Sequence, residues 1–417
     1  MIGNEPQRRI FMFSDKKLSS RNVFLAVGVF AMLFSGILYA WSILKVPFKT
    51  EFGFSDSSLA FSFTLTMCSF CIGAFFGSQL FKRIGTRLTI ILSGLLVGIG
   101  FICTGLITGS IVYLYIFYAV FAGLGIGIAY NVVISTVNAW FPDKKGLCSG
   151  ALMMAFGAST LILGKVIEAL FNMESFGWQK TFIVFGVVTS LVLILTGFIL
   201  KRPSAEVVFP EVKSNQKANK ENFEVKDYTT SQMIRRFTFW RAFICLVCLT
   251  AVGNSVISFA RDLVLSVGAE VSLATTLVGV LSVCNGLGRI LTGALFDAAG
   301  RRITMLASNL ITVFAAGVTL VAVFMGSLPL CIVGLCLTGI SYGSCPTVCS
   351  AFVAAFYGPK NFPSNFSVIN FNLLAASFIA TISSNLLLST GSYTAPFVLL
   401  LGLSVLALGL NLSIRKP

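Results

Sequence analysis

The sequence contains no histidine and few charged residues. Its 417 residues include 30 Lys and Arg and 15 Asp and Glu, so 11% are charged, against roughly 25% in an average soluble domain. A soluble chain of this length could not cover its surface with so few charges, which excludes a soluble globular enzyme. Without histidine, the chain also lacks Ser-His-Asp and Cys-His catalytic groups and any histidine ligand for zinc or haem. We therefore expect no enzymatic activity, no cofactor and no metal site.

Long apolar runs, by contrast, are abundant. Hydrophobic residues make up 56% of the chain, and the mean hydropathy is +0.91. Because about 20 apolar residues in a helix span the hydrocarbon core of a bilayer, the sequence predicts an all-α membrane protein with 12 transmembrane helices. The segments are 23–46, 57–80, 88–109, 111–135, 147–170, 180–200, 240–265, 272–296, 303–325, 328–353, 364–388 and 393–413.

The net charge of +15 is distributed unevenly over the predicted loops. Placing the N-terminus in the cytoplasm puts 24 of the 30 Lys and Arg on the cytoplasmic side and four on the outside. Such an excess is the signal of the positive-inside rule. We interpret the basic residues as determinants of membrane orientation rather than as a nucleic-acid-binding surface. We predict a multi-pass protein of the plasma (cell) membrane with both termini cytoplasmic.

One long polar stretch divides the chain. Residues 201–239 are rich in Lys and Glu and follow the sixth apolar segment. We interpret them as a cytoplasmic linker between an N-terminal six-helix bundle, residues 1–200, and a C-terminal six-helix bundle, residues 240–417.

The two halves share landmarks at a nearly constant spacing. Gly85 and Gly300, each followed by arginine within two residues, are 215 residues apart. Two aromatic pairs, which begin at Trp140 and Phe356, are 216 residues apart. Two landmarks at one spacing indicate an internal duplication. A pseudo-symmetric bundle of two six-helix halves places its substrate site near the midplane, between the halves.

The loop after the eighth segment carries a known pattern. Gly293, Asp297, Gly300, Arg301 and Arg302 form G-x3-D-x2-G-R-R. Arginines near a helix end can pair with the aspartate or with helix carbonyls. The pattern resembles the cytoplasmic signature loop of the major facilitator superfamily, and the resemblance implies that fold and a gating role for these five residues.

The first-half copy of this loop is degraded. Ser78 occupies the glycine position and Lys82 the aspartate position, although Gly85 and Arg87 remain. If the first-half loop usually latches the cytoplasmic gate, that role is not expected in this chain.

A narrower resemblance covers the whole chain. It rests on the motifs Tyr39-Ala-Trp41-Ser42, Gly123-x-Gly125-x-Gly127-x-x-Tyr130, Trp140-Phe141-Pro142-Asp143-Lys144-Lys145-Gly146-x-x-x-Gly150 and Asn285-x-x-Gly288-Arg289-x-x-x-Gly293. Together these resemble the oxalate/formate antiporter family, which is related to the monocarboxylate transporters. The resemblance implies exchange of small organic anions by alternating access.

Arg289 is the main candidate for substrate binding. It lies inside the eighth apolar segment, where an unpaired charge costs at least about 2.5–3.5 kcal/mol. A planar guanidinium matches a carboxylate with two parallel hydrogen bonds. The resemblance implies the same role, because both related families place their substrate arginine at this R-x-x-x-G. The alternative is an arginine that reaches the cytoplasmic interface or caps helix carbonyls.

Four further side chains are candidates for the same site. Asn285 lies one turn before Arg289 on the same helix face, where it could orient the guanidinium, contact substrate or bond a neighbouring helix. Tyr39, Tyr130 and Tyr342 could hydrogen-bond a carboxylate while supplying apolar walls. The alternative for the tyrosines is packing, or a place in an interfacial belt.

Asn372 and Asp262 bear on the substrate and on coupling. The resemblance implies a second basic residue at Asn372 in oxalate transporters, so the amide here favours a monocarboxylate, or a larger acid held by hydrogen bonds. It also implies an aspartate at Asn285 in monocarboxylate transporters, and the amide weakens proton coupling there. Asp262, near the outer end of the seventh segment, is the candidate for proton coupling, and a structural or gating role is its alternative.

These observations favour a secondary active transporter of small organic anions, mono- or dicarboxylates, working by anion exchange. The alternatives are a proton-coupled monocarboxylate symporter and a transporter of another small solute, such as a sugar or drug. A ligand sensor would need a folded cytoplasmic domain, for which the linker is too short. We expect a monomer whose partners are a small carboxylate and the lipid bilayer, with no nucleic acid.

Overall fold

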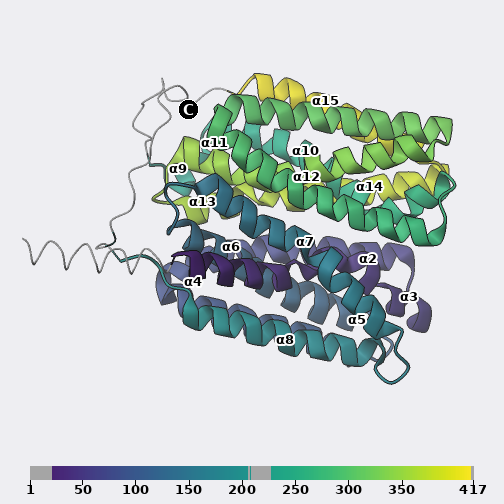
Figure 1. The fold of residues 1–417 in the computed structure, drawn as a ribbon, viewed down its shortest axis with the longest axis horizontal. Coiled ribbons are helices and arrows are strands. Elements are labelled where there is room, and N and C mark those ends of the chain that lie inside the picture. Colours follow the sequence, from purple (N-terminus) through teal and green to yellow (C-terminus); the bar gives the residue numbers. More distant parts are fainter. Residues whose placement is uncertain (1–20, 205–206, 208–226, 415–417) are drawn as a thin grey trace, which may run out of the picture.

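The structure, a computed structural model, describes residues 21–204, 207 and 227–414. Within these ranges every regular element is helical (Figure 1). Most of the predicted linker 201–239 and the basic residues before Arg21 lie outside the described residues. We call the end of the molecule where Leu200 and α9 lie the linker end; it is at the left in Figure 1.

The helices of the first half begin with the span Arg21–Ala40, whose last turn is the 3-10 helix η1 (Gly36–Ala40). The elements that follow are α2 (Trp41–Leu44), α3 (Val46–Phe52), α4 (Asp56–Thr104), α5 (Ile111–Leu114), η2 (Tyr115–Ala122), α6 (Gly123–Asn138), α7 (Lys145–Phe171) and α8 (Gly177–Ile199). Local sequence sets several of these boundaries. The side chain of Ser55 accepts a hydrogen bond from the N–H of Ser58 at 3.3 Å, which caps the start of α4.

The second half has the same pattern of long helices. Its elements are α9 (Thr230–Ile234), α10 (Phe237–Ser266), α11 (Val271–Met325), α12 (Leu328–Tyr357), α13 (Phe362–Ile369), α14 (Phe371–Thr390) and α15 (Thr394–Leu412). A capping box begins α9, because Thr229 and Gln232 each bond the backbone N–H of the other. The predicted segment 364–388 is thus two helices, separated at Asn370.

The elements α4 and α11, of 49 and 55 residues, are each about twice as long as a membrane span, because each consists of two helices that meet at a glycine. Gly85 (φ 80°, ψ 177°) and Gly300 (φ 74°, ψ −179°) have non-helical backbone angles at these two points. Only glycine adopts these angles readily. Ten helices of the described chain are long and apolar enough to cross a membrane. The predicted number of twelve, which divides each long helix at its glycine, stays a prediction.

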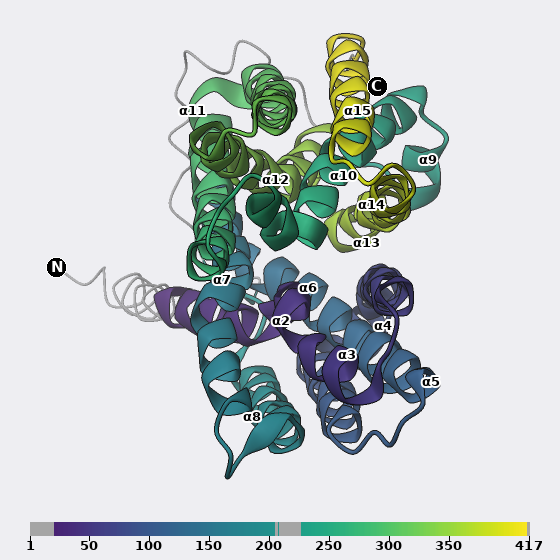
Figure 2. The same ribbon diagram turned by 90° about the vertical axis from the view of Figure 1, so that its right-hand side faces the viewer.

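The helices gather into two groups that follow the sequence. Figure 2 shows α2 to α8 together and α9 to α15 together, with α7 lying against α11. Hydrogen bonds between side chains or backbone join α4 of the first group to α13 and α14 of the second. They connect Thr64 with Thr381 (3.0 Å), Cys71 with the carbonyl of Asn370 (3.4 Å) and Ser78 with Ser367 (3.5 Å).

Glycines allow α7 and α11 to approach closely. A Cβ added to Gly286 would lie 3.1 Å from Cγ of Met154, and one added to Gly279 would lie 3.3 Å from Cδ1 of Leu161. Small residues at such crossings let helices pack in a membrane, where apolar burial between helices gives little driving force. This crossing between the two halves holds the candidate site.

Candidate functional site

Arg289 of α11 is one of the largest fully buried side chains, with 1% of its surface exposed. Its Nε donates a hydrogen bond to Oδ1 of Asn285 at 3.1 Å, as the spacing of one helical turn permits. Its Nη1 donates to the backbone carbonyl of Met153 in α7, across the two halves. Its Nη2 is buried and has no hydrogen-bond partner among the described residues. The guanidinium is therefore hydrogen-bonded through two of its nitrogens, and the third nitrogen is buried without a partner in the described chain.

Glycine makes room on α7 for this side chain. A Cβ added to Gly157 would lie 3.3 Å from Cζ and 3.5 Å from Nη2 of Arg289, and one added to Gly150 would lie 3.3 Å from the carbonyl oxygen of Arg289. A larger residue at Gly157 would compete with the guanidinium for the same space. The glycine of α7 and the arginine of α11 thus form one packing unit between the halves.

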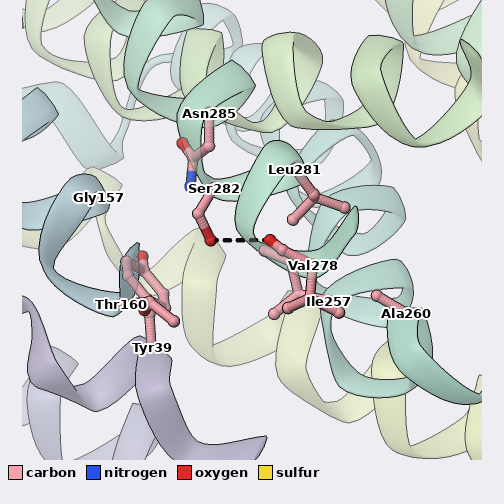
Figure 3. A pocket seen from close by; sticks show the side chains of 9 residues that line it. All are labelled: Tyr39, Gly157, Thr160, Ile257, Ala260, Val278, Leu281, Ser282 and Asn285. Carbon is pink, nitrogen blue, oxygen red and sulfur yellow. Dashed lines mark hydrogen bonds between the residues drawn. The ribbon is translucent and has the colours of Figure 1, made fainter. Parts of the chain in front are cut away.

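A small cavity lies beside Asn285 and Gly157, the two residues that contact the guanidinium of Arg289 (Figure 3). It is lined by Tyr39, Gly157, Thr160, Ile257, Ala260, Val278, Leu281, Ser282 and Asn285. Arg289 is not among these described lining residues, but Asn285 and Gly157, which contact its guanidinium, are. The volume of the cavity is about 20 Å³. That is enough for water but too little for a carboxylic acid, so a substrate could enter only after helices move.

Tyr39 and Tyr342 meet beside the cavity, although they come from different halves. Their hydroxyl oxygens are 3.2 Å apart, and the Tyr342 hydroxyl donates to Oδ1 of Asn254 at 2.8 Å. Asn254 in turn donates to Oγ of Ser377 at 3.3 Å. Because Tyr342 has one hydroxyl proton and gives it to Asn254, its oxygen can accept the proton of Tyr39. Asn254 was not anticipated from sequence, where it is one polar residue inside an apolar segment.

Tyr130 packs within an aromatic cluster nearer the linker end. Its ring centroid lies 5.1 Å from that of Phe70, 5.1 Å from that of Phe156 and 6.3 Å from that of Phe366. The Phe156 ring also lies 5.4 Å from Tyr39. The sequence did not single out Phe156, because one phenylalanine among 40 carries no positional signal. The cluster gives the centre of the molecule an apolar wall contributed by both halves.

Asn372 is held inside the second half. Its Oδ1 accepts from the Thr250 hydroxyl at 2.9 Å, and its Nδ2 donates to the carbonyl of Ile369 at 2.6 Å and contacts Sγ of Cys349 at 3.4 Å. In this conformation the amide links α10, α12 and the break between α13 and α14. It does not line the cavity near Arg289.

The signature loop lies at the linker end and touches the other half. The carboxyl of Asp297 lies close to the backbone N–H of Leu147, in the first turn of α7, and this N–H offsets part of the rise that burial causes in the pKa of Asp297. The first N–H groups of a helix lack partners within it, and an acceptor with negative charge suits them. Arg301 lies with its Cζ 4.6 Å from the ring centre of Phe356, and Arg302 follows it on α11.

Asp262 lies far from the guanidinium along the chain and is exposed near the end of α10. Its carboxylate lies within electrostatic range of Tyr393. The described residues around the cavity do not include it. The described part of the chain also contains no group of three or more Cys, Asp or Glu placed to hold a metal ion.

Comparison with known proteins gives a family match over nearly the whole chain. The sequence pattern of the Major Facilitator Superfamily matches residues 23–261 and 242–417. The uncharacterized MFS-type transporter YhjX of Escherichia coli (strain K12) is 26% identical over 339 residues, 80% of this chain and 80% of that protein. The oxalate:formate antiporter of Oxalobacter formigenes is 26% identical over 289 residues, 69% of this chain and 66% of that protein.

Two further comparisons extend this result. Monocarboxylate transporter 12-B of Danio rerio is 30% identical over 145 residues, which are 35% of this chain and 30% of that protein. Among solved structures, the proton:xylose symporter XylE bound to 6-bromo-6-deoxy-D-glucose superposes with a TM-score of 0.74 at 13% identity. The superposition covers 95% of this chain and 97% of XylE, and at this identity the likeness concerns the fold alone.

Proposed function

The chain belongs to the major facilitator superfamily, and from this premise we propose that it exchanges small organic anions across a membrane. The predicted fold class, all-α with the fold of that superfamily, is confirmed. A transport protein rather than an enzyme is confirmed as well. The resemblance to oxalate/formate antiporters and monocarboxylate transporters is confirmed by relatives of both kinds. The substrate and the mode of transport are our proposal.

The incomplete hydrogen bonding of Arg289 carries this proposal. Its buried Nη2 has no partner in the described chain, and its Nη1 bonds a neutral carbonyl, that of Met153. A buried charge is stable when it is paired and fully hydrogen-bonded. A carboxylate accepting from Nη2, and from Nη1 after displacing the carbonyl, would supply both. A neutral sugar or a cation would leave the charge unpaired.

The same bonds favour exchange over uniport. Without an anion, Nη1 of Arg289 ties α11 of the second half to α7 of the first. A carboxylate that takes over Nη1 releases this tie and neutralises the charge. The halves can then move relative to each other as alternating access requires. A transporter without bound anion keeps both the bond between α11 and α7 and the buried charge. Its change of conformation back to the other side of the membrane is therefore slow, and it requires a second anion.

Proton-coupled symport of a monocarboxylate is the alternative, and the site gives it less support. Symport needs a group near the substrate that takes up a proton. In the described chain, the cavity presents the amide of Asn285 and hydroxyl groups but no carboxyl group, and Asp262 is exposed at the end of α10. One buried cation, with Asn372 bonded inside its own half, favours a monocarboxylate over a dicarboxylate.

The setting of the transporter is proposed with it. The chain is a multi-pass membrane protein by family and by its apolar helices. We place it in the plasma membrane as a monomer with both termini in the cytoplasm, since the basic loops lie at the linker end. We retain the division into residues 1–200, 201–239 and 240–417.

Counterflow in proteoliposomes tests this function. Vesicles loaded with an unlabelled carboxylate such as formate, acetate or glycolate should take up the labelled acid transiently and above its equilibrium level, and vesicles without internal acid should not. Protein-free vesicles correct for passive diffusion. Counterflow of a labelled sugar with none for any carboxylate would reject the proposal. Uptake into empty vesicles driven by a proton gradient would establish the symport alternative.

Asp297 serves in this scheme as a latch at the linker end. Its carboxyl, on the signature loop of the second half, lies close to the N–H of Leu147 at the start of α7 in the first half. This contact can exist only while the two halves are closed at this end. The degraded first-half copy, with Ser78 and Lys82, offers no aspartate for the equivalent contact. The latch is therefore one-sided, and one substitution should weaken it.

Replacing Asp297 by Asn should open the linker end more often. The thiol of Cys71 is buried and bonded to the carbonyl of Asn370 across the halves, so its alkylation by N-ethylmaleimide reports opening. Loss of a charge at a helix N-terminus is worth about 0.5–1.4 kcal/mol, so labelling of Cys71, measured by mass spectrometry without substrate, should rise about 2- to 10-fold.

Asp143→Asn is the matched control for this experiment. Asp143 bonds Arg21 at 3.1 Å, and both residues belong to the first half, so its loss should leave Cys71 labelling nearly unchanged. Labelling of Cys345, buried inside the second half, corrects for unfolding. Equal labelling in the Asp297→Asn variant and the unmodified protein would show that Asp297 is not a latch.

A further inference from the structure

Thr160 of α7 has a buried hydroxyl that lacks the bond many helical threonines make. Thr104, Thr181 and Thr196 donate to the carbonyl four residues earlier at 2.6–2.7 Å, whereas Thr160 and Thr136 do not. Oγ1 of Thr160 has no hydrogen-bond partner within the described ranges, although only 7% of the residue is exposed. The residue lines the same cavity as Asn285 and lies beside Tyr39 (Figure 3). An unpaired buried hydroxyl is unfavourable unless something in the cavity bonds it.

The position of Thr160 relative to the guanidinium is set by α7. Gly157 abuts Cζ and Nη2 of Arg289, and Thr160 follows it by three residues. The two positions therefore share a helix face and differ by about 4.5 Å along the axis. Thr160 lies on the side away from the linker end, where the cavity extends.

A small acid bound to Nη2 would meet this hydroxyl at a predictable atom. The carboxylate carbon of an acid on Nη2 would lie close to the level of Gly157. An oxygen on the neighbouring carbon is two bonds from the carboxylate carbon, and it would extend away from the guanidinium toward the level of Thr160. The hydroxyl of Tyr39, which also lines the cavity, closes the same side.

We propose that Thr160 is a specificity-determining residue, which hydrogen-bonds a substrate oxygen other than those held by Arg289. It would favour short acids with a hydroxyl or oxo group on carbon 2 over the corresponding unsubstituted acids. This inference rests on the proposed function of Arg289 as the carboxylate site. Thr160 adds a second polar contact, contributed by the opposite half of the molecule, so binding of such an acid requires both halves.

Competition between glycolate and acetate tests this role. The two acids differ by one hydroxyl group, and each is added unlabelled against counterflow of labelled glycolate in proteoliposomes. In the unmodified protein, glycolate should inhibit at a concentration about 3- to 10-fold lower than acetate, the range expected for one hydrogen bond. Thr160→Val, which replaces the hydroxyl by a methyl group, should reduce this ratio to nearly one. Thr160→Ser, which keeps the hydroxyl, should retain it.

Ser159→Ala is the matched control. Oγ of Ser159 is also buried without a partner among the described residues, but Ser159 packs toward Gly36 and does not line the cavity. Its removal should leave the ratio unchanged.

Each outcome of the competition separates the two proposals. An unchanged ratio in Thr160→Val, no preference in the unmodified protein, or exchange of acetate without exchange of glycolate would overturn the role of Thr160 while the carboxylate site stands. Failure of every carboxylate to exchange would instead overturn the proposed function. Equal melting temperatures of the variants in detergent confirm that folding is not the cause.

Discussion

Replacement of Arg289 by glutamine is expected to abolish carboxylate exchange, lowering its rate at least about 100-fold. Hydrogen bonds between a guanidinium and a carboxylate contribute about 1.5–3 kcal/mol each, and the substitution removes two of them together with the charge. Glutamine is shorter and neutral, so it cannot hold a carboxylate at the level of Gly157. Counterflow of labelled glycolate, with equal amounts of protein in each vesicle preparation, measures the loss.

Two further observations make this result specific to carboxylate binding by the Arg289 guanidinium. Arg289→Lys keeps the charge but loses the planar fork, so it should retain exchange at a rate roughly 10-fold or more below that of the unmodified protein. In Arg289→Gln the tie to the Met153 carbonyl is absent. Cys71 should therefore be alkylated faster even without an anion. Undiminished exchange in Arg289→Gln would show that Arg289 does not bind the substrate carboxylate. Unchanged Cys71 labelling would show that the bond from Arg289 to the Met153 carbonyl does not hold the halves together.

The sequence predicted the part of this site that lies on α11, namely the contact between Asn285 and Arg289. The spacing of Asn285 and Arg289 fixes their contact, because residues four apart on a helix face each other. The duplication, read from Gly85 and Gly300, predicted matching turns, and both glycines have nearly the same backbone angles. Short-range geometry and glycine conformation follow from local sequence, so these features need no tertiary information.

The contacts between helices could not be predicted in the same way. The partner of Nη1 is a backbone carbonyl, which every residue has, so nothing in the sequence distinguishes Met153. The Thr160 hydroxyl differs from other threonine hydroxyls in having no hydrogen-bond partner among the described residues, and the sequence does not show which groups lie near it. Asn372 was proposed to face substrate, and its role there stays a prediction, since the structure places both ends of its amide on α10, α12 and the break at Asn370. The rotation of each helix about its axis determines which side chains face the neighbouring helix. A uniformly apolar segment gives little indication of that rotation.

Helix boundaries were predicted in part. The predicted segments 57–80 and 88–109 lie on either side of Gly85, at whose non-helical backbone the two helices of α4 meet. The predicted segment 364–388 is divided at Asn370, whose Nδ2 is buried without a partner in the described chain. Hydropathy marks where the chain is apolar, whereas turns inside apolar stretches depend on single residues.

Replacement of Gly157 by valine is the second substitution with a large expected effect. A Cβ at this position already lies 3.3 Å from Cζ of Arg289, and the two methyl groups of valine would occupy the space of the guanidinium itself. The side chain of Arg289 would have to leave α7, giving up both its tie and its place next to the cavity. We expect carboxylate exchange to fall at least about 30-fold, measured by counterflow at matched protein amounts.

The neighbouring glycine of the same crossing provides the control. A Cβ at Gly279 would lie 3.3 Å from Cδ1 of Leu161, the far end of a flexible side chain that can turn aside. Gly279→Val should therefore keep exchange within about 3-fold of the unmodified protein, although it alters the same helix pair. If Gly157→Val and Gly279→Val lose exchange equally, close packing of α7 on α11 is the requirement. If only Gly157→Val loses it while the melting temperatures agree, the space opposite the guanidinium is what transport needs.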